Sequence, residues 1–564
     1  MNIATIFACA YVSVVAGAMA AQGNEVPMSG SAESGSSEFV REQSSSGDAI
    51  STDTRNHCDR LAADPKDKDK PADVAGVDKP SAEAVEACAA AVTADPQNAR
   101  LNYQAGRAYR KSQDFAKAFY YFDRANSLGS LRAAVAVADA YMSGSGVAKD
   151  EGKALDLLKR AASGGDVSAV LQLGKYYSKG PSKNLDLALS WLSSAEDGEV
   201  FIALGDLYVS EIRNDAIALK WYRKAADLKK PVAYKRLGWA YFNGRGVPAD
   251  VTQAVEWDKL AWEEFPDVAT NIASSYSRLG NTPEAVAWLE RGIARGDAPS
   301  AYVLADTYRS CTCVERDHGK ALELYKKAVD LGHVDSLLNL GRMYRDGDGV
   351  EKNIPLAIEY FGKAIERGQK DGNFWLATSY RDLGDHSRAI ETFKKAAEAG
   401  DSTAMYVLAG YYRDGNGIKQ SYTEALAWFK KAAEAGDSDA MNWVGRFYAA
   451  GWSVKQNYVE AGRWYEKAGA AGQGWGNSNL AIFFSRGWGV KKDVALAVDL
   501  QETAMKQSTE VCAEFKKSWS NWTPEFLRAF QSRLAQGYNY KGAIDGRLGS
   551  GSMAAIEAIC ARQG

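Results

Sequence analysis

Residues 402–437 decide the fold and read STAMYVLAGYYRDGNGIKQSYTEALAWFKKAAEAGD. The first part, Ser402 to about Tyr412, and the second part, Tyr422 to about Ala435, each predict a helix. In the second helix, apolar residues recur at i, i+3, i+4 and i+7 and form one stripe, at Ala425, Trp428, Phe429 and Ala432. Gly436 stands where a helix end favours a positive φ, and Asp437 or Ser438 can cap the next helix. Two short helices cannot bury this stripe alone, so neighbouring copies have to cover it.

One element of this stretch recurs along the chain: an apolar residue, a small residue, two variable residues and an aromatic residue. The aromatic residue stands at Tyr109, Tyr141, Tyr177, Tyr208, Tyr241, Tyr276, Tyr308, Tyr344, Tyr380, Tyr412, Tyr448 and Phe484. The intervals are 31 to 36 residues, and twelve units at this spacing predict an all-α solenoid. Aromatic residues also recur at the Trp428 position, and we interpret them as core between repeats rather than as a ligand-binding stripe.

A loop motif, G-x-G-V, separates the two helices of many units. It stands at residues 144–147, 244–247, 347–350 and 487–490, with the variants GNGI at 415–418 and GWSV at 451–454. Units with this loop resemble Sel1-like repeats, which are relatives of tetratricopeptide (TPR) repeats with a longer loop. Units with intervals of 31 to 33 residues lack the loop and look more like short TPRs. The resemblance covers residues 98 to about 508 and implies a right-handed superhelix of about twelve helix pairs that holds other proteins and catalyses no reaction.

The N-terminus is typical of an exported protein. Residues 3–20 are apolar or small, and Ala18-Met19-Ala20 fits a cleavage site, so residues 1–20 are predicted to be a signal peptide. No Lys or Arg precedes this segment, and an uncut membrane anchor is the alternative. Residues 21–56 are rich in Ser, Gly and Glu and are predicted to be disordered.

The segment 57–96, with helices expected at 57–63 and 81–92, resembles the Cys-bearing cap that precedes Sel1 repeats in secreted alphaproteobacterial proteins. This resemblance implies a bacterial protein that is periplasmic or secreted. The repeat solenoid is then expected to occupy residues 97–510.

Six cysteines remain once the signal peptide is removed: Cys58, Cys88, Cys311, Cys313, Cys512 and Cys560. An even number suits an oxidising compartment and predicts disulfides, with six reduced, buried thiols as the alternative. Sequence leaves 15 pairings open, and position along the chain favours the three local pairs. Cys311 and Cys313 occupy the two glycine places of the loop after Tyr308, so we expect a short bridge to pin that turn. A strained bridge of this kind could also serve a redox role.

The C-terminal segment, residues 511–564, breaks the repeat period. It resembles a small peptidoglycan-binding-like helical module, through residues that include Gln531, Leu534, Gly537, Gly542, Gly546 and Ile556. In that family the stretch between two helices can present aromatic and polar groups to a glycan or peptide, which implies contacts at Tyr538, Tyr540, Asp545 and Arg547 here. Cys560 and Arg562 depart from the usual ending. The alternative is a terminal cap that covers the apolar face of the last repeat.

The sequence predicts no enzyme. Its four histidines lie in different units, and no metalloprotease, P-loop or nucleophile-elbow motif is present. We therefore expect no catalytic residue, no cofactor and no metal. A formal net charge of -3 argues against nucleic acid as a partner, and no apolar run beyond the N-terminus is long enough to predict a stable membrane span.

The predicted function is a non-catalytic protein-protein interaction scaffold of the bacterial cell envelope, tethered to peptidoglycan if the C-terminal module binds it. The partner is expected on the concave face of the solenoid. Variable positions beside the repeat aromatic give three candidates for this groove: Asp206, Arg342 and Arg446. The alternative is a periplasmic regulator that binds a membrane sensor or exopolysaccharide machinery, and an adaptor of the eukaryotic endoplasmic reticulum ranks last.

Overall fold

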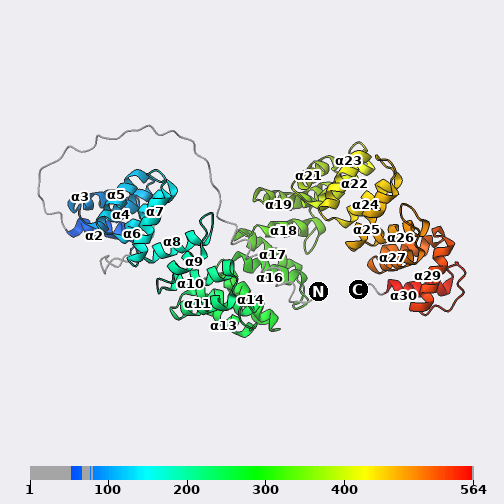
Figure 1. Cartoon of the computed structure of the whole chain (residues 1–564), viewed down its shortest axis with the longest axis horizontal. Helices are drawn as coiled ribbons and strands as arrows, with labels where there is room; N and C mark the ends of the chain where they lie inside the picture. The colour runs from blue at the N-terminus through cyan, green and yellow to red at the C-terminus, as the bar shows by residue number, and fades with distance from the viewer. Residues whose placement is uncertain (1–51, 66–75, 78–79, 562–564) are drawn as a thin grey trace. The chain divides into compact units, whose positions relative to one another are not determined.

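The computed structural model describes residues 52–65, 76–77 and 80–561 (Figure 1). The described residues form 29 α-helices and contain no strand. The predicted signal peptide and residues 21–51 of the segment predicted to be disordered lie outside the described residues. The chain divides into two compact units, Met1–Asp297 and Ala298–Gly564, and each is described by itself.

The first unit holds a two-helix N-terminal segment, α2 and α3, and six helix pairs, from α4/α5 to α14/α15. Its helices are α2 (Thr52–Ala62), α3 (Ala84–Ala94), α4 (Ala99–Lys111), α5 (Phe115–Ser127), α6 (Leu131–Ser143), α7 (Glu151–Ser163), α8 (Val167–Ser178), α9 (Leu185–Leu192), α10 (Gly198–Leu207), α11 (Asp215–Asp227), α12 (Pro231–Asn243), α13 (Val251–Ala261), α14 (Val268–Arg278) and α15 (Thr282–Ala294). A short π-helix, η1 (Tyr208–Ile212), follows α10. The first helix, α2, begins five residues before its predicted start at residue 57. The second, α3, begins three residues after its predicted start at residue 81.

The second unit holds six further pairs, α16/α17 to α26/α27, and three C-terminal helices. Its helices are α16 (Ala298–Ser310), α17 (His318–Asp330), α18 (Asp335–Asp346), α19 (Ile354–Glu366), α20 (Gly372–Asp382), α21 (His386–Glu398), α22 (Ser402–Asp414), α23 (Tyr422–Glu434), α24 (Ser438–Ala450), α25 (Tyr458–Ala470), α26 (Gly474–Arg486), α27 (Val494–Gln507), α28 (Thr509–Ser518), α29 (Pro524–Gly537) and α30 (Ser550–Cys560). A 3-10 turn, η2 (Trp519–Asn521), follows α28.

The twelve helix pairs confirm the predicted all-α repeat solenoid. Residues 402–437 fold as α22 and α23, and Gly436, which follows α23, adopts a φ of +97°. The side chain of Asp437 then accepts a hydrogen bond of 2.7 Å from the backbone N–H of Ala440 and caps α24. The predicted helix ends and caps of this unit are therefore confirmed.

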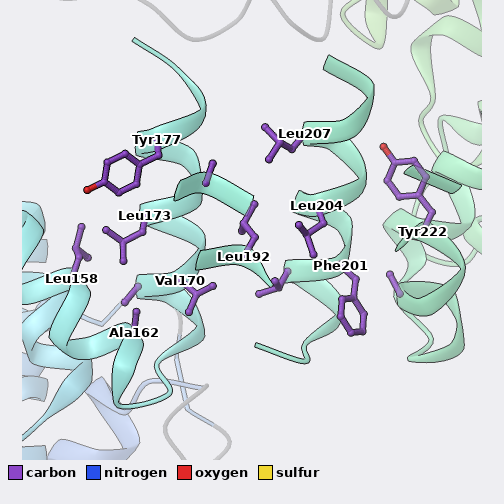
Figure 2. Packing of buried hydrophobic residues seen from close by; sticks show 14 of the residues in the cluster. Leu158, Ala162, Val170, Leu173, Tyr177, Leu192, Phe201, Leu204, Leu207 and Tyr222 are labelled. Atoms are coloured by element: carbon purple, nitrogen blue, oxygen red, sulfur yellow. The ribbon is translucent and has the colours of Figure 1, made fainter. Parts of the chain in front are cut away.

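In each pair, the second helix places one side chain four residues after the recurring alanine. We name this place the core position. Ten of the twelve core positions hold buried apolar or aromatic residues: Phe122, Leu158, Leu192, Tyr222, Leu289, Tyr325, Phe361, Phe393, Phe429 and Tyr465. Figure 2 shows Leu158, Leu192 and Tyr222 among the buried residues between successive helices of the first unit. Small residues of the first helix make room for them, since a Cβ on Gly205 would lie 2.3 Å from the Tyr222 ring. The two exceptions are polar, Asp258 and Gln501, and both are buried.

The G-x-G-V loop needs its second glycine for two reasons. Gly146 adopts a φ of +77°, and a Cβ there would lie 2.1 Å from the carbonyl oxygen of Phe115. In the variant loop, Ser453 adopts a φ of +58° and its hydroxyl donates to the carbonyl oxygen of Tyr422. Cys311 and Cys313, which replace both glycines, are not among the described residues with positive φ. The sequence predicted the same turn here as in the glycine loops. The backbone conformation of this loop is different.

The C-terminal helices share one hydrophobic cluster with the last repeat. Phe515 of α28 and Phe526 and Phe530 of α29 are buried together with Met505 of α27 and Ile556 of α30. The chain therefore continues its core past the last helix pair without a break.

Candidate interaction surface

The first helices of the second unit bring arginines onto a tryptophan of the next pair. Arg342 and Arg345 lie one turn apart on α18, and Trp375 lies on α20. The guanidinium carbons lie 4.8 Å and 4.7 Å from the centre of the Trp375 ring, within the range of a cation–π interaction. Two cations thus share one indole ring.

A second cluster of this kind lies on α22 and α24. The guanidinium carbons of Arg413 and Arg446 lie 4.0 Å and 3.9 Å from the ring centre of Trp443. The core residue Phe429 stacks on the same tryptophan, with ring centres 5.6 Å apart and an interplanar angle of 8°. The buried core therefore fixes the orientation of the ring that carries both arginines. We name the six residues of the two clusters the Arg–Trp surface: Arg342, Arg345, Trp375, Arg413, Trp443 and Arg446.

Two of these arginines have no carboxylate partner within the described part of the chain. Arg345 pairs with Asp346, and Arg413 pairs with Asp414 at 2.6 Å. No ion pair joins a described carboxylate to Arg342 or Arg446, and the buried Nε of Arg342 has no hydrogen-bond partner. Arg342 and Arg446 are the two arginines that the sequence analysis named as groove candidates. It did not name the tryptophans that they contact.

The third predicted groove residue has a different setting. Asp206, on α10 of the first unit, accepts hydrogen bonds from the Tyr222 hydroxyl at 2.7 Å and from the Arg236 Nε at 3.0 Å. Burial, with the nearby Asp206 charge, raises the pKa of Tyr222 well above its usual value. The side chain of Asp206 is therefore hydrogen-bonded within the first unit, where it joins α10 to α11 and α12.

The side chains of three of the four residues predicted to contact peptidoglycan form hydrogen bonds within the described part of the chain. The Tyr538 hydroxyl donates to Glu502 Oε1 at 2.6 Å, and the Tyr540 hydroxyl donates to the carbonyl oxygen of Ala543 at 2.8 Å. Asp545 Oδ1 accepts from the backbone N–H of Arg547 and from Gln531, and these hydrogen bonds lower the pKa of Asp545. Three of the four side chains thus stabilise the loop between α29 and α30, and their contact with peptidoglycan stays a prediction.

The structure joins the six cysteines as three local disulfides, Cys58–Cys88, Cys311–Cys313 and Cys512–Cys560. The first joins α2 to α3, and the third joins α28 to α30. Arg107 of α4 ties the N-terminal segment down further, because its guanidinium donates to the carbonyl oxygens of Ala62 and Val77 at 2.7 Å each.

Within the described residues, no group of three or more His, Cys, Asp or Glu side chains could hold a metal ion. Across the same residues, no helix combines the length and the apolarity that crossing a membrane requires.

Comparisons with known proteins agree with this architecture. The Sel1 repeat model matches eleven segments: residues 99–130, 131–166, 167–198, 204–230, 231–261, 276–297, 298–333, 334–369, 402–437, 438–473 and 476–504. A tetratricopeptide repeat model matches residues 371–399, where the loop motif is missing. Sel1 repeat solenoids are generally non-enzymatic interaction scaffolds. No curated protein matches the chain.

Similar solved structures include two bacterial repeat proteins. One is a protective antigen of uropathogenic Escherichia coli with an SLR fold, at 25% identity over 74% of this chain and 94% of the other, with a TM-score of 0.43. The other is a Sel1 repeat protein from Oxalobacter formigenes, at 24% identity over 59% of this chain and 91% of the other, also with a TM-score of 0.43. Because the Sel1 segments together cover more than half of the sequence, the chain belongs to the Sel1 repeat family.

Proposed function

We propose that the chain is a non-catalytic protein-binding scaffold of the bacterial cell envelope, and that the Arg–Trp surface binds the partner. Sel1 and TPR repeats are typical of protein-interaction scaffolds. The observation that carries the proposal is the state of Arg342 and Arg446: each rests on a tryptophan and has no described carboxylate partner. Arginine and tryptophan are also the residues that most often dominate the energetics of protein interfaces.

The chemistry of this surface favours an acidic partner segment. A guanidinium presents several N–H donors in a fixed plane and binds carboxylates with two parallel hydrogen bonds. The tryptophan rings add apolar area that a neighbouring side chain of the partner can cover. Since the whole chain carries a net charge of -3, the attraction comes from this local arrangement rather than from an overall positive charge.

Reversing the two unpaired charges is expected to remove partner binding. In the double variant Arg342→Glu, Arg446→Glu, both cations become anions that repel an acidic segment, and we expect affinity to fall at least about tenfold. The measurement is quantitative capture of envelope proteins from cells that make the protein, with wild-type and variant chains immobilised side by side.

The matched control is Lys394→Glu, Arg463→Glu, which makes the same charge change on α21 and α25. These side chains are 55% and 67% exposed and lie on second helices, whereas the Arg–Trp surface lies on first helices. Proteins retained by the control and lost by the Arg342, Arg446 variant are the expected partners. Equal capture by both variants would reject the surface.

Two observations support the envelope as the location. The six cysteines are joined in three disulfides, which persist in oxidising compartments, and the predicted signal peptide and the C-terminal resemblance agree with export. The proposal also includes a tether to peptidoglycan through the C-terminal module. We expect the mature chain to pellet with purified peptidoglycan sacculi and the Arg547→Ala variant to pellet less, while Lys517→Ala, on exposed α28 surface, behaves as wild type. If the wild-type chain stays in the supernatant, the tether is wrong and the protein-binding role is untouched.

A further inference from the structure

The three disulfides differ in what they hold together. Cys58–Cys88 spans 30 residues and joins α2 to α3, and Cys512–Cys560 spans 48 residues and joins α28 to α30. Cys311–Cys313 spans two residues, and both of its cysteines lie in the loop between α16 and α17. This short bridge therefore joins no two helices.

The loop that carries the short bridge is closed at its base by other contacts. The backbone N–H of Asp317 donates to the carbonyl oxygen of Tyr308 at 3.0 Å, and the Asp317 side chain accepts from the N–H of Lys320 and caps α17. An equally long glycine loop is closed in the same way, by Asp150 on the carbonyl oxygen of Tyr141 at 3.1 Å. The helix pair α16/α17 therefore does not need the bridge to keep its loop in place.

The fold gives this bridge little protection against reduction. A disulfide stabilises the folded state chiefly by restricting the unfolded chain, and the effect grows with the number of residues that the bridge encloses. By thermodynamic linkage, folding protects a disulfide to the same extent as the disulfide stabilises the fold. Cys58–Cys88 and Cys512–Cys560 are therefore protected more strongly than Cys311–Cys313.

The two cysteines of the short bridge have unequal surroundings. Cys311 is 3% exposed, whereas Cys313 is partly exposed and open to attack from solvent. The backbone N–H of Cys313 donates to Cys311 Sγ at 3.2 Å. A hydrogen bond of this kind favours the thiolate of Cys311, so Cys311 is the better leaving group when a thiol attacks Cys313.

We propose that the Cys311–Cys313 bridge oxidises a pair of thiols on a substrate protein, which is an activity beyond protein binding. One substrate thiolate attacks Cys313 Sγ, a mixed disulfide forms, and the bond to Cys311 breaks with Cys311 leaving as the thiolate. The second substrate thiolate then attacks the substrate sulfur of the mixed disulfide, and Cys313 leaves. The substrate ends with a disulfide, and the two electrons and two protons that it loses convert Cys311 and Cys313 to thiols. Each reaction consumes one bridge, so the exchange is stoichiometric.

The test titrates the oxidised full-length chain with a reduced peptide that carries two cysteines and, in parallel, with reduced glutathione. Samples are quenched with acid, alkylated and digested, and mass spectrometry measures the open fraction of each bridge. We expect Cys311–Cys313 to open at a peptide concentration at least about tenfold lower than Cys58–Cys88 and Cys512–Cys560, which serve as controls in the same sample. The peptide should act at a lower concentration than glutathione, because its second attack is intramolecular.

Two single variants locate the attacked sulfur. Cys311→Ser leaves the partly exposed Cys313, which should form a mixed disulfide with oxidised glutathione at least about tenfold faster than the buried Cys311 left by Cys313→Ser. The double variant Cys311→Ser, Cys313→Ser should unfold at the same temperature as wild type, because the loop keeps the hydrogen bonds at its base.

Three results would overturn the proposal: opening of all three bridges at the same peptide concentration, faster reaction of Cys311 than of Cys313, or glutathione acting as well as the peptide. A clear fall in the unfolding temperature of the double variant would also overturn it and assign the bridge to the stability of the turn. None of these results affects the test of the Arg–Trp surface, because the variant Arg342→Glu, Arg446→Glu keeps both cysteines.

Discussion

Replacing Phe429 by alanine is expected to destabilise the second unit by about 3–5 kcal/mol, the usual cost of removing a buried phenylalanine. Phe429 is fully buried, and its ring contacts Tyr406 of α22 and both Trp443 and Phe447 of α24, with ring centres 5.6 to 5.7 Å apart. The loss therefore affects its own pair, α22/α23, and the following pair, α24/α25. Since each repeat contacts mainly its neighbours, the effect should decay along the array.

Amide hydrogen exchange measures this effect helix by helix. We expect faster exchange in α22 to α25 and unchanged exchange in α4 to α9 of the first unit. The control is Leu383→Ala, at a side chain that is 48% exposed, where a change within about 0.5 kcal/mol is expected. Unchanged protection in α22 to α24 would contradict the assignment of Phe429 to the core position. Because Phe429 also supports Trp443, the same variant should weaken capture of the partner.

Replacing Asp258 by leucine is expected to stabilise the first unit by about 1–3 kcal/mol near neutral pH, which is the penalty for a buried polar group without a partner. Asp258 holds a core position, is 1% exposed, and its Oδ1 has no hydrogen-bond partner in the described part of the chain. Leucine has nearly the same shape and is found at the core position of three other repeats.

The gain should depend on pH. Burial raises the pKa of Asp258 well above its usual value, although the nearby Lys235 opposes this. The folded state therefore binds a proton that the unfolded state has already lost. Stability conferred by this protonated carboxyl is fully present below about pH 4 and is lost as the pH rises through the folded pKa.

Hydrogen exchange of α12 to α14 at pH 5 and pH 8 measures both effects. We expect the difference between Asp258→Leu and wild type to be larger at pH 8. The variant Asp258→Asn should remove the pH dependence and keep most of the penalty of an unpaired polar group. A leucine variant less stable than wild type at pH 8 would show that Asp258 has a partner in solution.

Much of the fold could be predicted because local signals and long-range packing agree in this chain. The spacing of Tyr412 and Tyr448, the alanine stripe and Gly436 each indicate the same helix pair, and the structure has that pair. Ser453 shows the limit of such signals: it takes the left-handed conformation of a glycine because the loop around it imposes that turn. At Cys311 and Cys313 the sequence pointed to a glycine-like turn, and the backbone takes another conformation.

The candidate site was predictable only in part. Arg342 and Arg446 stood out as variable residues beside the repeat aromatic. The tryptophans beneath them were missed, although Trp375 and Trp443 both stand five residues before the repeat aromatic of their units. Asp258 and Gln501 were missed, although aligning the twelve second helices on their recurring alanine would have exposed both as polar residues in an apolar column. The physical consequence, an unpaired buried atom, required coordinates.

The most direct test of the central claim is photo-crosslinking from a position one helical turn before Arg413 of the Arg–Trp surface. Gly410 lies on α22, between the two clusters in sequence, and a Cβ there would have no atom within 4 Å, so p-benzoylphenylalanine can be placed there without a clash at its Cβ. Gly362, on the second helix α19, offers the same open space and serves as the matched control. The account predicts that a partner captured from the envelope crosslinks from position 410 and not from position 362. Equal crosslinking at both positions, or crosslinking from position 362 alone, would contradict it.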